Sequence, residues 1–202
     1  MPQPSSANKK LKVNEIFYSV QGEGLHTGMS AVFVRLAGCL MGCDWCDTKY
    51  AAKINFLLTP AQILARIKKY PARRIVITGG EPCEQDIIPL IKLLRKTKYE
   101  VHLETNGSVN INTSLFFCTT VSPKKYADIK MLKKADVIKL VVDGKISKKN
   151  ILAYKKYINK KTSLYLQPEG NKKENIAKCL QIIKQNPQIK LSAQLHKLLK
   201  IK

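Results

Sequence analysis

The sequence predicts an α/β fold, a partial (βα)6 barrel of mainly parallel strands in a single domain. Short β-branched or aromatic runs alternate with helical patterns along the chain. Several of these runs are apolar throughout, as in parallel strands that are buried on both faces. The length of 202 residues suits one domain with its own core, and six strand–helix units are too few for a closed eight-stranded barrel.

Six segments have the composition of strands. They are rich in Val, Ile, Leu and aromatic residues, and turn-forming residues such as Gly, Pro and Asn follow several of them. The predicted strands are 31–36, 75–78, 100–104, 116–121, 137–142 and 163–166.

Four helices are predicted from apolar residues that recur at helical spacing. Thr59 and Pro60 offer an N-cap and a first-turn proline for a helix that ends near Tyr70. The other three helices are predicted at 86–96, 147–160 and 172–185.

The chain contains no linker or internal repeat, so we expect one domain over 1–202 with a flexible N-terminal segment at 1–12. No apolar run reaches the roughly 18 residues of a membrane-spanning helix. Residues 1–10 lack the apolar stretch of a secretory signal. We therefore expect a cytoplasmic protein whose six cysteines are reduced, and thus metal ligands or core residues.

The net charge of +22 comes mainly from lysine, with 31 Lys against five Arg. Residues 121–202 hold 21 Lys and five acidic residues, an excess of 16. A positive surface attracts nucleic acid and other anions. Lysine pairs spread along helices are more typical of a soluble surface, and arginine is preferred for bidentate phosphate contacts. Nucleic acid is therefore not the expected main partner.

Polar residues follow five of the predicted strands. Cys39 follows the first, 79–82 the second, 105–107 the third, 122–124 the fourth and 167–169 the sixth. Functional groups of parallel α/β folds lie at the carboxyl ends of the strands. We therefore expect one shared pocket at this edge.

Three cysteines, Cys39, Cys43 and Cys46, lie within eight residues with spacing C-x3-C-x2-C. Thiolates bind zinc or iron–sulfur clusters. A structural zinc site needs a fourth ligand, which Cys83 or His26 could supply after folding. Three thiolates on a four-iron cluster would instead leave one iron open to an exchangeable ligand, which is a catalytic arrangement.

The triplet after the first strand and Gly79-Gly80-Glu81-Pro82 after the second resemble the radical S-adenosylmethionine superfamily. Further segments resemble the 7-carboxy-7-deazaguanine synthase family within it. These are Asn14-Glu15-Ile16-Phe17, Val20-Gln21-Gly22-Glu23-Gly24, 33–39, 45–48, 78–82, 103–107, 121–124 and Gln194-Leu195-His196-Lys197. They run from residue 14 to residue 197, nearly the whole chain.

The resemblance implies a 4Fe-4S cluster on Cys39, Cys43 and Cys46, S-adenosylmethionine on its open iron, and Mg²⁺ on Thr48. In the superfamily, one-electron cleavage of the cofactor yields a 5′-deoxyadenosyl radical. The implied cofactor-binding residues are Trp45, Asp47, Gly79, Gly80, Glu81, Ser122, Pro123, Lys124, Tyr165, Leu166, Gln167 and Pro168.

The substrate that the resemblance implies is 6-carboxy-5,6,7,8-tetrahydropterin, which the family converts to 7-carboxy-7-deazaguanine with loss of ammonia on the way to queuosine and other deazapurines. A flat heterocycle needs in-plane donors and acceptors, and Arg35 offers a fork for the carboxylate. The expected substrate-binding residues are Val20, Gln21, Gly22, Glu23, Arg35, Thr78 and His196. His196 follows a strand-like run at 189–192, so the terminal segment is expected to close over the substrate.

The resemblance further implies a homodimer and a reductant such as flavodoxin or ferredoxin. Two alternatives share part of the pattern: an activase of a glycyl-radical enzyme, and a zinc-stabilised basic module that binds RNA. An activase has no use for the segments 21–24 and 194–197, and the basic module does not explain the polar residues at five strand ends. Cys83, Cys118, Cys179 and His102 are interpreted as packing residues.

Overall fold

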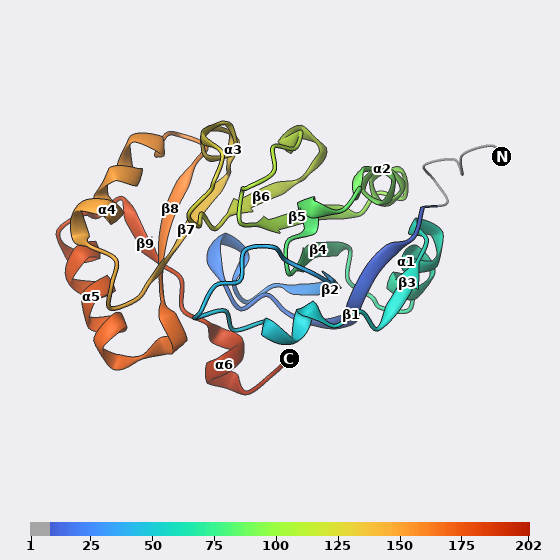
Figure 1. The fold of residues 1–202 in the computed structure, drawn as a ribbon, viewed down its shortest axis with the longest axis horizontal. Coiled ribbons are helices and arrows are strands. Elements are labelled where there is room, and N and C mark those ends of the chain that lie inside the picture. The colour runs from blue at the N-terminus through green and yellow to red at the C-terminus, as the bar shows by residue number, and fades with distance from the viewer. Residues whose placement is uncertain (1–8) are drawn as a thin grey trace. The chain divides into compact units, whose positions relative to one another are not determined.

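The computed structural model describes residues 9–202, which form two compact units. Unit 1 comprises Ser30–Thr105, Ile111–Cys118 and the described part of Met1–Ser19. Unit 2 comprises Val20–Met29, Asn106–Asn110 and Thr119–Lys202. In Figure 1 most of unit 1 is coloured from blue to green and most of unit 2 from yellow to red.

The strands of unit 1 follow the order β3-β1-β2-β4-β5. They are β1 (Leu11–Val20, whose last residue belongs to unit 2), β2 (Ser30–Leu36), β3 (Phe56–Leu58), β4 (Arg74–Gly79) and β5 (Glu100–Thr105). Strand β3 pairs antiparallel with β1, whereas β2, β4 and β5 are parallel. Parallel strands end at one edge, so the cysteine loop after β2 and the Gly79-Gly80 turn after β4 come together there.

One face of these strands packs against two helices, α1 (Pro60–Ile67) and α2 (Ile88–Lys96). Thr59 caps α1 in a capping box with Gln62, and Pro60 occupies its first turn, as the sequence predicts. Ile63 and Ile67 of α1 and Leu90 and Leu94 of α2 belong to one buried cluster with β2, β4 and β5. Short 3₁₀ turns lie at Lys49–Ala52, Pro82–Glu84 and Thr113–Leu115.

The opposite face of unit 1 carries a small apolar cluster and the predicted site residues. Phe33 and Val76 pack there with Phe17 of β1. Because side chains alternate along a strand, Arg35 follows Phe33 on this face, and the register pairs Arg35 with Thr78. The strands therefore bring two predicted substrate contacts together.

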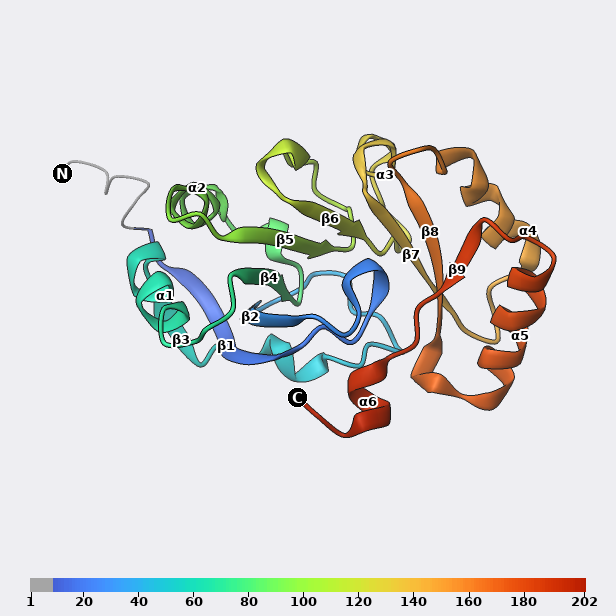
Figure 2. The same ribbon diagram turned by 180° about the vertical axis from the view of Figure 1, so that it is seen from behind.

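Unit 2 has parallel strands in the order β6-β7-β8-β9. They are β6 (Cys118–Val121, whose first residue belongs to unit 1), β7 (Val137–Val142), β8 (Ser163–Pro168) and β9 (Ile189–Leu191). The helices are α3 (Ile129–Lys134), α4 (Lys148–Leu152), α5 (Lys173–Lys184) and α6 (Leu195–Leu199), and 3₁₀ turns lie at Gly24–His26, Ala153–Tyr157 and Glu169–Asn171. Figure 2 shows α5 alongside β8 and β9, which it contacts.

All six predicted strands are present, and the predicted α/β class with a mainly parallel sheet is confirmed. The sequence reasoning missed β1, β3, α3 and α6. The predicted helix at 147–160 is shorter, because α4 ends at Leu152 and a 3₁₀ turn follows. Of the N-terminal segment expected to be flexible, residues 1–8 lie outside the described part, whereas β1 begins at the buried Leu11.

Among the described residues, no helix is both long and apolar enough to cross a membrane.

Candidate active site

The three cysteines lie on the loop that follows β2 in unit 1. Cys39 is exposed and Cys43 and Cys46 are half-buried, and none is in a disulfide. The loop turns sharply at Gly38 and Gly42, whose φ angles of 95° and 59° are in the left-handed region that favours glycine. The Cys46 amide donates to the Cys43 carbonyl at 3.1 Å. Three thiols are thus gathered on one short, tightly turned loop.

The thiol of Cys39 has a raised pKa, because partial burial disfavours the thiolate and Glu84 and Glu81 add negative charge. The amide of Met41, which donates to its sulfur at 3.5 Å, partly opposes this shift. A bound metal cluster would supply the positive charge that the thiolate needs, so binding would release a proton.

Gly79 and Gly80 support the cysteine loop directly. The Gly80 amide donates to the Leu36 carbonyl at 3.0 Å, and the Glu81 amide to the Gly38 carbonyl at 2.8 Å. A Cβ atom on Gly79 would lie 2.1 Å from the Leu36 carbonyl oxygen, and one on Gly80 would lie 1.9 Å from that of Gly38. Both positions need glycine because the backbone of the turn after β4 touches the backbone at Leu36 and Gly38. This requirement holds independently of any contact between the glycines and a cofactor.

Glu81 is 1% exposed and its carboxylate is held by protein donors. Its Oε1 accepts from the Thr105 hydroxyl at 2.6 Å and from the Cys83 amide at 3.0 Å. The carboxylate therefore ties the turn after β4 to the end of β5. Its contact with the ammonium of a cofactor stays a prediction.

Thr48 lies beside the third cysteine, with its hydroxyl oxygen 3.5 Å from the Cys46 sulfur. Trp45 is half-buried and Asp47 is exposed on the same loop. The structure thus keeps these three residues with the thiols, as expected from their positions in the chain.

Arg35 is held in place by Glu15 and Phe17, which belong to the first family segment, and by Tyr50, which belongs to none. Its Nε donates to Glu15 Oε1 at 2.9 Å, and the Tyr50 hydroxyl donates to the same oxygen at 3.3 Å. The guanidinium lies 5.8 Å from the ring centre of Phe17 and 5.5 Å from that of Tyr50. The Tyr50 pKa is raised, first by burial. Stacking and the Nε bond orient the guanidinium plane.

In unit 2 the segment Val20–Gly24 packs against the terminal segment 192–197. The Leu195 amide donates to the Gly22 carbonyl at 3.0 Å, and the Gly24 amide to the Ser192 hydroxyl at 2.9 Å. A Cβ atom on Gly22 would lie only 2.4 Å from His196 Nδ1. His196 is thus brought to the predicted substrate loop, and closure of the terminal segment over a substrate stays a prediction.

Glu23 is the centre of a polar cluster within unit 2. Its Oε2 lies 2.5 Å from Lys139 Nζ, and its Oε1 accepts from Gln194 at 3.0 Å and from Gln167 at 3.3 Å. Gln167 Oε1 in turn accepts from the Ser192 hydroxyl at 3.2 Å. The predicted residues Glu23 and Gln167 therefore meet, together with Gln194, which belongs to the terminal family segment, and Lys139, which belongs to none of the segments singled out from the sequence.

The other predicted residues of unit 2 lie at the ends of β6 and β8. Lys124 donates to the Ser122 hydroxyl at 2.8 Å, next to Pro123. Tyr165 is buried under Lys190, whose ammonium lies 5.6 Å from the ring centre. Leu166 and Pro168 are buried. That the site residues of both units face one shared pocket stays a prediction.

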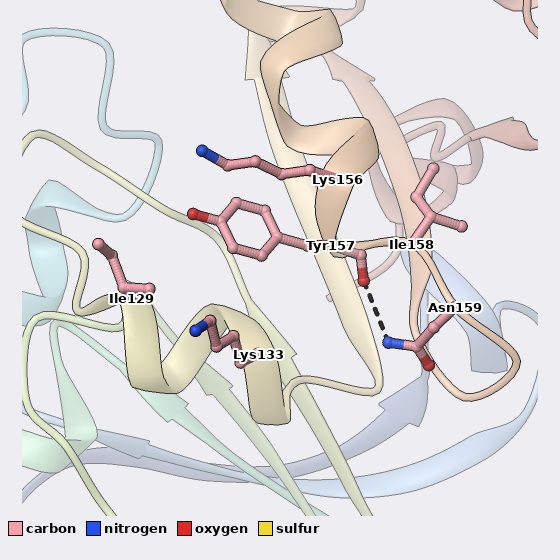
Figure 3. A pocket seen from close by; sticks show the side chains of 6 residues that line it. All are labelled: Ile129, Lys133, Lys156, Tyr157, Ile158 and Asn159. Carbon is pink, nitrogen blue, oxygen red and sulfur yellow. Dashed lines mark hydrogen bonds between the residues drawn. The ribbon is translucent and has the colours of Figure 1, made fainter.

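A cavity of about 420 Å³ in unit 2 holds none of the predicted site residues. Figure 3 shows Ile129 and Lys133 of α3 across from Lys156 and Tyr157, with Ile158 and Asn159 beside them. Two ammonium groups and no carboxylate line it, so it would suit an anion, but its polar groups are on the surface and nothing marks a ligand.

The comparisons with known proteins agree with this geometry. Residues 34–186 match the model of the radical SAM superfamily. The chain is 36% identical to the 7-carboxy-7-deazaguanine synthase of Buchnera aphidicola, over 94% of this chain and 98% of that one. It is 37% identical to the synthase of Bacteroides thetaiotaomicron, over 95% and 98% of the two chains.

The chain belongs to the 7-carboxy-7-deazaguanine synthase family. The crystal structure of QueE from Escherichia coli superimposes with a TM-score of 0.78 at 31% identity, covering 95% of this chain and 96% of that one. As a member of the radical SAM superfamily, the enzyme uses a 4Fe-4S cluster and S-adenosylmethionine.

The residues of this synthase fit the cluster. Three thiols share one loop, and a three-thiolate set leaves one iron for S-adenosylmethionine. The remaining cysteines, Cys83, Cys118 and Cys179, are buried as predicted. Burial raises the pKa of the Cys83 thiol, and raises that of Cys179 to about 12. The two buried thiols with a raised pKa, those of Cys83 and Cys179, suit packing rather than metal binding.

His102 is also buried, and its interpretation as a packing residue stays a prediction. Its Nε2 accepts from Arg74 at 3.1 Å, and its ring lies 5.4 Å from that of Phe117. A signal for the missed residue Lys139 is present in the sequence: it is a lone charge within an apolar strand, as Arg35 is.

Proposed function

We propose that this enzyme converts 6-carboxy-5,6,7,8-tetrahydropterin to 7-carboxy-7-deazaguanine with loss of ammonia, in the biosynthesis of queuosine and other deazapurines. The observation that carries the proposal is the match to proteins named 7-carboxy-7-deazaguanine synthase, which covers nearly the full length of both chains. The polar clusters around Arg35 and Glu23 support it, since they provide the charged and amide groups that a carboxylated pterin requires.

Cys39, Cys43 and Cys46 would hold the cluster. When bound, the cluster and S-adenosylmethionine supply an organic radical that abstracts hydrogen from the substrate. The chain's part is to position both reactants. We assign contacts with S-adenosylmethionine to Trp45, Asp47, Gly79, Gly80, Glu81, Ser122, Pro123, Lys124, Tyr165, Leu166, Gln167 and Pro168, each by its place in a family motif.

Arg35 would bind the substrate carboxylate. Because its Nε is bonded to Glu15, the two terminal amino groups of the guanidinium are the part that can form a fork–fork pair. Val20, Gln21, Gly22, Glu23, Thr78 and His196 would contact the heterocycle.

Thr48 would bind Mg²⁺. A hydroxyl is a hard oxygen ligand, and Mg²⁺ takes few protein groups besides water and substrate oxygens. The support from geometry is the position of this hydroxyl beside Cys46, at the loop that carries the thiols.

The enzyme would act in the cytoplasm as a homodimer, and would take its electron from a reductant such as flavodoxin or ferredoxin.

The test compares the carboxypterin with the same pterin lacking its carboxylate, using reconstituted wild-type enzyme and Arg35→Gln. Loss of a charged hydrogen-bonded pair, about 1.5–3 kcal/mol, should weaken carboxypterin binding about 10- to 100-fold in the variant. Binding of the analogue should not change. Arg66→Gln, an arginine that stacks on Phe56 in the same unit, is the matched control. Equal losses for both ligands would remove Arg35 from the carboxylate site.

A further inference from the structure

We infer that Lys139 is a positioning residue of the substrate site, which holds Glu23 ionised and correctly oriented for the heterocycle. This inference rests on the proposed function, in which Glu23 contacts the pterin. Lys139 belongs to none of the motifs that mark the family in this chain.

Lys139 occupies the middle of β7, a strand whose other residues are apolar. Its side chain is 7% exposed. The register pairs Lys139 with Tyr165 and Val141 with Gln167, so all four side chains share one face of the two strands. This is the face on which Glu23 is bound, whereas the alternate residues Ile138 and Leu140 face the apolar core.

The contacts of Lys139 fix one oxygen of Glu23, and two amides fix the other. Lys139 approaches Oε2, while Gln167 and Gln194 donate to Oε1. These donors come from β7, from β8 and from the segment before α6, which are far apart in the chain. A carboxylate bound through both oxygens by three rigid elements has a defined plane and direction.

Stability alone does not account for a lysine at this position. A buried ion pair gives little net stability, because desolvation offsets the attraction, and an apolar pair of similar size is often as stable. Ring N–H and amino groups of a pterin need an acceptor, and an ionised carboxylate is the strongest available. Lys139 provides the positive charge beside this half-buried carboxylate.

The test is a double-mutant cycle on the reconstituted enzyme, with Lys139→Met, Glu23→Gln and the double variant. The measured quantities are the dissociation constant of the carboxypterin, the iron content and the melting temperature. Lys184→Met is the matched control, since Lys184 is exposed in the last turn of α5. We expect the control to match wild type in all three.

Each single variant should bind the carboxypterin at least tenfold more weakly than wild type, with normal iron content. The double variant should bind no more weakly than Glu23→Gln, because Lys139 acts through Glu23. It should also melt above Lys139→Met, since no unpaired charge is left buried. If Lys139→Met alone fails to fold, the carboxypterin dissociation constants of Glu23→Gln and of the double variant can still be compared.

Additive losses in the double variant, or wild-type affinity in Lys139→Met, would overturn the role of Lys139 and leave the proposed function intact. A wild-type enzyme that does not bind the carboxypterin would overturn the proposed function, and the inference with it.

Discussion

Six cysteines of one chain fall into two chemical classes because of where the fold places them. Cys39, Cys43 and Cys46 lie on an exposed or half-exposed loop, whereas Cys83, Cys118 and Cys179 are buried. Burial without a metal keeps a thiol protonated, as the raised pKa values of Cys83 and Cys179 indicate. The spacing predicts the same division, since three thiols within eight residues fit one metal centre.

Changing any one of Cys39, Cys43 and Cys46 to Ala should abolish the cluster, because two thiolates hold four irons poorly. Iron and sulfide analysis after anaerobic reconstitution measures this. Cys179→Ala is the control: it should keep full iron content and lose about 1 kcal/mol of unfolding free energy from the small cavity. Iron loss in Cys83→Ala equal to that in Cys39→Ala would indicate a four-thiolate site and refute the open iron.

At the scale of the element, loops that end neighbouring strands fit together through backbone contact. The turn after β4 touches the cysteine loop after β2 so closely that Gly79 and Gly80 have no room for a side chain. The segments Gly22–Gly24 and 194–196 meet in the same way in unit 2. The sequence could predict that such loops share an edge, but not that glycine is needed there for contact between protein segments.

Gly80→Ala should therefore displace the cysteine loop and lower the iron content several-fold, because the new methyl group would overlap the Gly38 carbonyl. Gly144→Ala is a matched control, since a Cβ at Gly144 meets nothing within 4 Å. Iron analysis and absorption spectra of the two reconstituted variants measure the effect. Full cluster content in Gly80→Ala would show that the loop position does not depend on this contact.

The terminal segment should matter for substrate and not for the cluster. His196→Ala, and Gly22→Ala, whose methyl group would displace His196, should both weaken carboxypterin binding while iron content stays normal. Titration of the reconstituted variants with the carboxypterin tests this. If His196→Ala and a chain lacking residues 197–202 both turn over substrate with wild-type kinetics, His196 is not part of the site.

At the scale of the whole molecule, local patterns revealed the strands and the cofactor loop, but not the partners of the site residues. Apolar runs mark β2, β4 and β7, whereas Asn14 and Glu15 interrupt the pattern of β1 and hid it. The contacts of Glu23 with Lys139 and Gln194 span 116 and 171 residues of sequence. No periodicity or spacing reports pairings over such separations.

The net charge of +22 suggested nucleic acid at first sight, yet the lysines with a defined role act singly. Lys139 binds one carboxylate, and Lys124 bonds to a neighbouring serine. Most of the remaining lysines are exposed, in loops and turns as well as in helices, which suits solubility and the attraction of anionic ligands.

Product analysis tests the proposed reaction. Anaerobically reconstituted enzyme is incubated with the carboxypterin, S-adenosylmethionine, a reductant and Mg²⁺, and the products are identified by mass spectrometry together with an assay for ammonia. We expect 7-carboxy-7-deazaguanine and ammonia in equal amounts, formed only when all components are present. Cleavage of S-adenosylmethionine without any deazaguanine, in a protein with its full cluster, would contradict the proposed reaction.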